Sequence, residues 1–134
     1  MPVQMTLSRI LITELQDLQI IELCEEDGDR TFPILIGINE AEAIRRRFTG
    51  IQLKRPLTHE LMESVIRELG GELESISITD LSEHTFFATL NVRLAGGDLA
   101  EIDARPSDAI AMVVGRDLPI YVAEHVLEEA TSEP

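Results

Sequence analysis

The chain has 134 residues, a hydrophobic fraction of 44% and a formal net charge of −14, which suits one globular domain with a single core. No apolar run approaches the ~18 residues that a membrane span needs, and the N-terminus lacks a basic segment followed by an apolar one, so we expect a cytoplasmic protein. The negative charge argues against broad nucleic-acid binding, because such affinity comes mostly from basic side chains, and any phosphate must therefore be bound locally.

The first fifty residues predict three strands and a helix. Residues 10–13 and 19–24 have strand patterns, an Asp-Gly turn signal follows at 26–29, and residues 32–36 return as a third strand. We expect Asn39 to cap the next helix, with Glu42 in the capping-box position and Gly50 just past the helix end.

A second helix is predicted between two Pro- and Gly-containing boundaries. Thr58 is expected to cap it, Leu57 and Met62 to pack across its first turn, and Gly70-Gly71 to end it. The apolar face that this helix should pack against the protein comprises Leu61, Met62, Val65, Ile66 and Leu69.

The remaining residues repeat the plan of the first fifty. We expect strands, a turn and a helix, then a last strand and a short helix. In chain order these elements span 73–81, 85–94, 95–98 (the turn), 99–104, 106–116, 120–122 and 124–130.

An internal repeat accounts for this similarity. Shifting the sequence by 66 positions aligns residues 7–63 with 73–129 without a gap, and eleven of the 57 pairs are identical, whereas random pairing gives roughly three or four. We therefore predict one domain over residues 1–134, built by duplication of a β-β-β-α unit. The expected fold class is α+β, with a twisted, mostly antiparallel sheet and helices packed on it.

Charged residues crowd the start of the helix at 106–116. Pro106 suits a first helical turn, and Asp108 can accept a backbone N–H that has no partner within the helix. Capping leaves Arg105 and Asp103 unexplained. Arg105 either pairs with Asp103 or Asp108 inside the protein, or binds a phosphate at the helix end.

A similar Arg-Pro sequence precedes the helix that starts near Thr58. His59 in its first turn is a candidate for proton transfer or metal binding, and the alternative is an ordinary hydrogen-bonding surface histidine. Five basic residues lie within eleven positions here, and they form either a phosphate-binding patch or a solvated surface: Arg45, Arg46, Arg47, Lys54 and Arg55.

Three segments carry a resemblance to a known family. They read FPILIGINEAEAIRRRFTG, KRPLTHELMESVIRELG and EIDARPSDAIAMVVGRDLPIYV. They resemble the signature blocks of the bifunctional nuclease domain family, small prokaryotic and plant domains described as having DNase and RNase activity. The resemblance runs over nearly the whole chain, and it implies an α+β fold, DNA and RNA as substrates, and self-association. Glu60 stands where the family often has Asp, and Gly115 where a better helix former is common.

The site roles follow from the chemistry of phosphodiester hydrolysis, which needs an activated water and stabilisation of the charge that grows on the phosphate. We expect His59 to transfer protons, together with the catalytic residues Asp103, Asp108 and Arg105. The expected substrate-binding residues are Arg55, Lys54, Arg45 and Arg46. A divalent Mg²⁺ or Mn²⁺ ion would be held by Asp103, Asp108, Glu40 and Glu42.

A second function remains open at this point. The same arginines could serve a non-catalytic anion-binding or regulatory module, and the two functions differ in what they require: a nuclease needs acidic groups near His59, whereas a ligand module needs only the arginines.

Self-association is also predicted from apolar strand surface. Ile20, Ile21, Leu23 and the apolar edge around Tyr121 should remain uncovered in a small sheet, which favours a homodimer or larger homo-oligomer.

Overall fold

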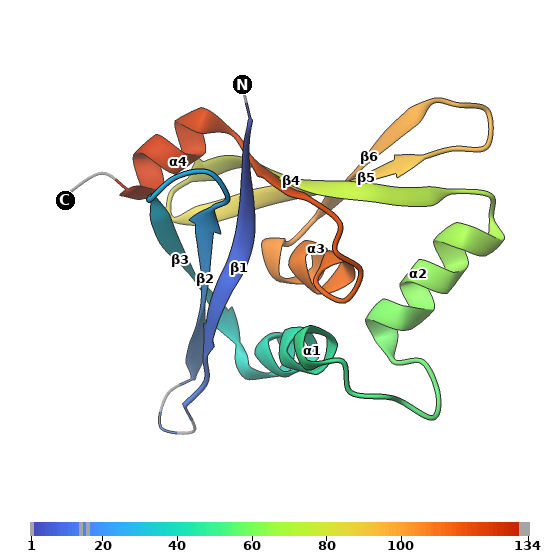
Figure 1. Ribbon diagram of the computed structural model, residues 1–134, viewed down its shortest axis with the longest axis horizontal. Coiled ribbons are helices and arrows are strands. Elements are labelled where there is room, and N and C mark those ends of the chain that lie inside the picture. Colours follow the sequence, from blue (N-terminus) through green and yellow to red (C-terminus); the bar gives the residue numbers. More distant parts are fainter. Residues whose placement is uncertain (1, 14, 16, 132–134) are drawn as a thin grey trace.

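A computed structural model of the chain describes residues 2–13, 15 and 17–131. Within these residues the structure holds one sheet and four helices (Figure 1). The strands are β1 (Val3–Leu11), β2 (Leu18–Glu25), β3 (Thr31–Gly37), β4 (Glu72–Ser82), β5 (Thr85–Arg93), β6 (Leu99–Ala104) and β7 (Ile120–Val122). The helices are α1 (Ile38–Thr49), α2 (Thr58–Glu68), α3 (Pro106–Val113) and α4 (Glu124–Thr131).

The sheet consists of two antiparallel three-stranded units joined through β7. Its order is β3-β2-β1-β7-β4-β5-β6, with β7 antiparallel to β1 and parallel to β4. Figure 1 shows the twist of the sheet: β1 to β3 stand upright while β4 to β6 run across the view. The α+β class is confirmed. The strand order is mirrored about β7, and each unit is followed by a helix, but the duplication itself stays a prediction.

Alternating side chains build the core between the sheet and the helices. In β3 the residues Phe32, Ile34 and Ile36 are buried while their neighbours are exposed, as expected for a strand with one face on the core. Helix α3 supplies the other side of the core through the continuous run 109–113, all of it buried. Full burial of each large apolar side chain contributes about 1.5–3 kcal/mol, so these residues hold α3 firmly in position.

Three predicted helix boundaries need correction. Helix α1 begins at Ile38 with Gly37 at the N-cap, so Asn39 is not the cap, and Glu42 instead pairs with Arg45 at 2.7 Å. Thr58 is the first residue of α2 and not its cap. Helix α3 ends at Val113, earlier than expected, because Gly115 and the residues around it form a turn. Gly50 closes α1 with a φ of 73°, which confirms that prediction.

The apolar strand surface predicted to drive self-association is not there. Ile21 and Leu23 are buried, Ile20 is half-buried, and β7, which carries Tyr121, lies inside the sheet between β1 and β4. Exposed apolar side chains gather instead on α2, where most of the predicted core face is exposed. None of the helices in the described part of the chain has the length and apolarity to cross a membrane.

Candidate functional site

The site centres on the carboxylate of Asp108 in the first turn of α3. The Nε2 atom of His59, in the first turn of α2, lies 3.0 Å from Asp108 Oδ1. The Nε atom of Arg105, which immediately precedes α3, donates to Asp108 Oδ2 at 2.9 Å. The Asp108 carboxylate therefore binds both His59 and Arg105, two side chains that are 46 positions apart in the sequence.

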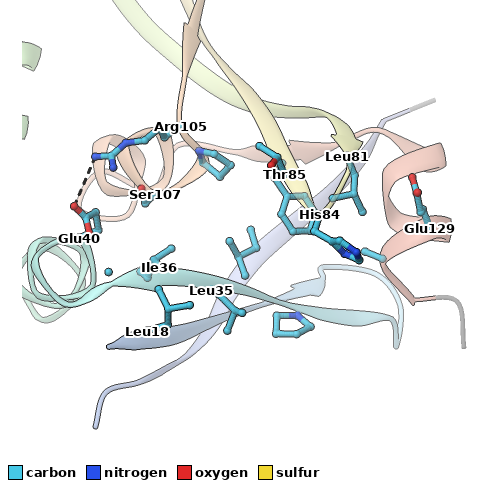
Figure 2. A pocket seen from close by; sticks show the side chains of 16 residues that line it. Leu18, Leu35, Ile36, Glu40, Leu81, His84, Thr85, Arg105, Ser107 and Glu129 are labelled. Atoms are coloured by element: carbon cyan, nitrogen blue, oxygen red, sulfur yellow. Dashed lines mark ion pairs between the residues drawn. The ribbon is translucent and has the colours of Figure 1, made fainter. Parts of the chain in front are cut away.

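Arg105 also faces an acidic residue of α1. Its Nη2 atom lies 3.7 Å from Oε2 of Glu40, the ion pair drawn as a dashed line in Figure 2. The Arg105 side chain nevertheless keeps 65% of its surface exposed, because both of its ion pairs lie at the rim of the site. A guanidinium that is paired and still exposed can bind a phosphate oxygen without leaving its position.

The contacts between Asp108 and Arg105 favour the charged form of both groups. Partial burial would raise the pKa of the Asp108 carboxyl, but the hydrogen bonds from Arg105 and His59 outweigh it and hold that pKa below its ordinary value. The hydrogen bond to Asp108 in turn raises the pKa of Arg105. At neutral pH Asp108 is therefore an acceptor for the histidine N–H, and Arg105 is a cation.

A second contact ties the first turn of α2 to the core. Arg47 of α1 has a side chain only 10% exposed, and its Nη1 donates to Glu60 Oε2 at 2.7 Å. Its Nη2 donates to the Met112 carbonyl oxygen at 3.2 Å. Burial would raise the pKa of Glu60, but the hydrogen bond from Arg47 helps to hold it below the ordinary value.

Sequence reasoning missed the role of Arg47. It grouped Arg47 with Arg45 and Arg46 as one patch or solvated face. The signal was nevertheless in the spacing, since Arg47 follows the buried residues Ala41 and Ile44 at helical intervals and so lies on the inner side of α1.

A cavity of about 640 Å³ lies beside Arg105 (Figure 2). Glu40, Arg105 and Ser107 line one end of it, and His84 and Glu129 line the other. Most of the lining between these ends is apolar and comes from β3 and the β4–β5 hairpin. The cavity can therefore take an apolar or aromatic group next to an anion bound by Arg105.

Asp103 does not join the site as expected. It lies on β6 opposite Thr89, it is exposed, and Arg105 pairs with Asp108 and Glu40 instead. The predicted internal pair of Arg105 with Asp108 is confirmed, whereas the pair with Asp103 is wrong. Arg105 is the N-cap residue of α3, and the Asp108 oxygens accept from His59 and Arg105, so Asp108 is not the predicted cap.

The four predicted metal ligands are not brought together. Glu42 pairs with Arg45, Glu40 and Asp108 pair with Arg105, and Asp103 stands apart on its strand. Among the residues that the structure describes, no group of three or more His, Cys, Asp or Glu side chains is arranged to hold a metal ion. These residues do not fit a preformed, all-protein metal site.

The predicted basic patch is divided. Arg46, Arg47 and Lys54 line a hollow of about 420 Å³ together with Arg116, which the sequence did not assign to this patch. Arg45 is paired with Glu42, and Arg55 is exposed beside the hollow without lining it. The hollow shares Glu60 and Arg47 with the contact that secures α2.

Comparison with known proteins gives one family and several relatives. Residues 21–134 match the model of the bifunctional nuclease domain. An uncharacterized protein of Mycobacterium tuberculosis is 39% identical over 125 residues, which cover 90% of this chain and 71% of that protein. Bifunctional nuclease 2 and bifunctional nuclease 1 of Arabidopsis thaliana are 28% and 27% identical over 109 residues, which cover 79% of this chain and about a third of each plant protein.

Proposed function

Because the chain belongs to the bifunctional nuclease domain family, we propose that it hydrolyses phosphodiester bonds of DNA and RNA with little sequence preference. One observation carries the proposal: His59 and Arg105 meet on the single carboxylate of Asp108. A nuclease needs an acidic group near its histidine, and an anion-binding module does not.

In the proposed mechanism Asp108 orients the histidine. When Nε2–H of His59 donates to Asp108, the other ring nitrogen, Nδ1, is the acceptor that takes a proton from the attacking water. The water oxygen bonds to phosphorus, the bond to the leaving sugar oxygen breaks, and the histidine returns its proton to that oxygen. Arg105 stabilises the negative charge that develops on the phosphate oxygens.

The basic residues near α2 would bind the nucleic-acid strand on either side of the cleaved phosphate. Lys54 and Arg46 at the hollow and the exposed Arg55 would contact flanking phosphates, and Arg45 would do so if its pair with Glu42 opens. Such contacts position the backbone and read no base, which agrees with low sequence preference.

A need for Mg²⁺ or Mn²⁺ is part of the proposal to be tested. Mg²⁺ is usually held by one or two carboxylates together with substrate phosphates, so it does not require a cage of protein ligands. Glu40 and Asp108 are the acids next to Arg105 that would contribute.

The decisive experiment is a turnover assay on single-stranded DNA and RNA, with and without Mg²⁺ or Mn²⁺. We expect His59→Asn to lower the rate by roughly 10²–10⁴-fold, the usual contribution of acid–base catalysis. His125→Asn is the matched control, because His125 also contacts a carboxylate, that of Asp80 at 3.2 Å, but on an exposed surface away from Arg105. Equal rates for wild type, His59→Asn and His125→Asn would contradict the role of His59 and would point to other residues or to a contaminating nuclease.

The second candidate is an anion-binding regulatory module. It is favoured by the cavity beside Arg105, whose mostly apolar lining suits a small anionic ligand better than a bare phosphate. In that case no variant alters turnover, while Arg105→Ala abolishes binding of the small anion that stabilises the wild type in a thermal shift screen.

A further inference from the structure

The cavity beside Arg105 is polar at its two ends and apolar between them. At one end Arg105 and Ser107 supply a cation and a hydroxyl (Figure 2). At the other end His84 and Glu129 supply polar groups, and Leu35 of β3, which is 60% exposed, lies between the ends. The volume of about 640 Å³ falls within the range of about 300–1,000 Å³ that is typical of small-molecule sites. The cavity is therefore large enough to enclose a specific ligand.

Ser107 is a polar group of this cavity that the protein leaves without a partner. The residue is 6% exposed, and its hydroxyl makes no hydrogen bond with the described part of the chain. It lines the cavity two positions after Arg105, as the second residue of α3. Because buried hydroxyls are normally hydrogen-bonded, this one is suited to a phosphate or sugar oxygen held beside the guanidinium.

An aromatic ring lies in the apolar part of the lining. Phe86 of β5 lines the cavity, and its ring stacks on that of the buried Phe32 with 5.5 Å between the ring centroids. This contact holds the Phe86 ring in place while the residue stays partly exposed. Proteins bind unpaired nucleobases by stacking them on aromatic side chains, and such contacts accept any base because every base has a π-face.

We propose that the cavity is a nucleobase pocket. Arg105 and Ser107 bind the phosphate that is to be cleaved, and the base of the adjoining nucleotide enters the apolar part beside Phe86. The proposal rests on the proposed function and names its substrate class, an unpaired strand. A base must leave the stack of a duplex to enter such a pocket, at a cost in free energy, so single-stranded DNA and RNA should be preferred over duplexes.

The far end of the cavity selects a nucleotide over other ligands that carry one anionic group. An aliphatic chain attached to the anion would bury His84 and Glu129 against methylene groups that form no hydrogen bonds, which is unfavourable. A base instead carries donors and acceptors along its edge and can bond to both side chains. Inorganic phosphate would occupy only the Arg105 end and leave the apolar lining uncovered.

The first test measures binding without any cutting. Calorimetric titration compares AMP with ribose 5-phosphate, which has the same sugar and phosphate but no base. We expect wild type to bind AMP at least about tenfold more tightly, the order of one base-stacking contact. Arg105→Ala should weaken the binding of both ligands by a similar factor, since Arg105 contacts only the phosphate.

Leu35→Glu tests the pocket itself. Leu35 is exposed, so the variant should fold, and its carboxylate would make the apolar middle of the cavity unfavourable for a base. We expect the ratio of the two affinities to fall close to one. Leu99→Glu is the matched control, because Leu99 on β6 is 46% exposed, carries the same change of charge and lines neither the cavity nor the hollow near α2.

A displacement experiment tests whether the pocket serves the strand. AMP should displace a labelled single-stranded oligonucleotide from His59→Asn, in which cutting is slowed, at concentrations near its own dissociation constant. In the turnover assay wild type should cut a single strand at least about tenfold faster than the same sequence in a duplex, and Leu35→Glu should lose most of this preference.

Four results would overturn the proposal: equal or undetectable binding of AMP and ribose 5-phosphate by wild type, a preference for AMP that survives Leu35→Glu, AMP that binds without displacing the strand, or equal cutting of single strands and duplexes. The binding results do not depend on catalysis. A protein that meets the binding expectations and cuts no nucleic acid would therefore contradict the proposed function and leave the nucleobase pocket supported.

Discussion

Helices α2 and α3 each bring one partner to the contact between His59 and Asp108, but the protein holds them in different ways. Six of the eight residues of α3 are buried, against none of the eleven residues of α2. Asp108 therefore stands on the core, while His59 stands on a helix attached through ion pairs, hydrogen bonds and the partly buried Ile66. Packing in the core therefore fixes the position of Asp108, whereas the position of His59 depends mostly on polar contacts, which are easier to break.

The largest expected effect comes from matched truncations in the two helices. Ile110→Ala in α3 removes a fully buried side chain and should lower the free energy of unfolding by about 2–5 kcal/mol. Ile66→Ala in α2 removes a partly buried side chain at the margin of the core and should cost less than half as much. Urea denaturation of both variants measures the difference, and equal losses would mean that α2 is as firmly packed as α3.

Breaking the polar attachment of α2 should have the next largest effect. Arg47→Met removes the donor to Glu60 Oε2 and to the Met112 carbonyl oxygen, at a cost of about 1–3 kcal/mol. A double-mutant cycle with Glu60→Gln isolates the contribution of the pair. A coupling energy near zero would mean that the ion pair between Arg47 and Glu60 does not hold α2 in place.

The comparison also predicts an acid-dependent loss of stability. The pKa of Asp108 is lowered in the folded protein, so its carboxylate stabilises the fold above the unfolded value of about 3.9, and this contribution is lost as pH falls through the folded value. Wild type should therefore exceed Asp108→Asn in urea midpoint at pH 7, and the gap should close toward pH 3. A gap that stays constant over this range would contradict the assignment.

The smallest stability effect is expected at Arg105. The Arg105 side chain is 65% exposed, so Arg105→Ala should cost less than about 1 kcal/mol. If Arg105 binds phosphate, nucleic-acid binding should weaken for all sequences and the salt dependence should fall by about one phosphate contact. Titrations of the folded variant at several salt concentrations measure this, and an unchanged slope would leave Arg105 with a purely internal role.

Local sequence signals determined most of the secondary structure. Strands such as 99–104 and 120–122, the Asp-Gly hairpin and the glycine end of α1 depend on alternation and turn chemistry within a few residues, and they are confirmed. The family also followed from contiguous segments. His59 and Arg105 meet at Asp108. Both were predicted as site residues because each lies at the start of a helix, close to a proline in the sequence.

Only the tertiary structure decided which groups meet and which face of each helix is covered. Periodicity shows that α2 has an apolar side but not that this side faces outward, because the direction depends on what else packs there. Likewise, the choice of Asp108 over Asp103 as the partner of Arg105 depends on the path of β6 into α3, and the burial of Arg47 depends on α1 packing against α3, with Glu60 of α2 close enough to accept from it. These are long-range contacts, and a pattern of neighbouring residues does not encode them.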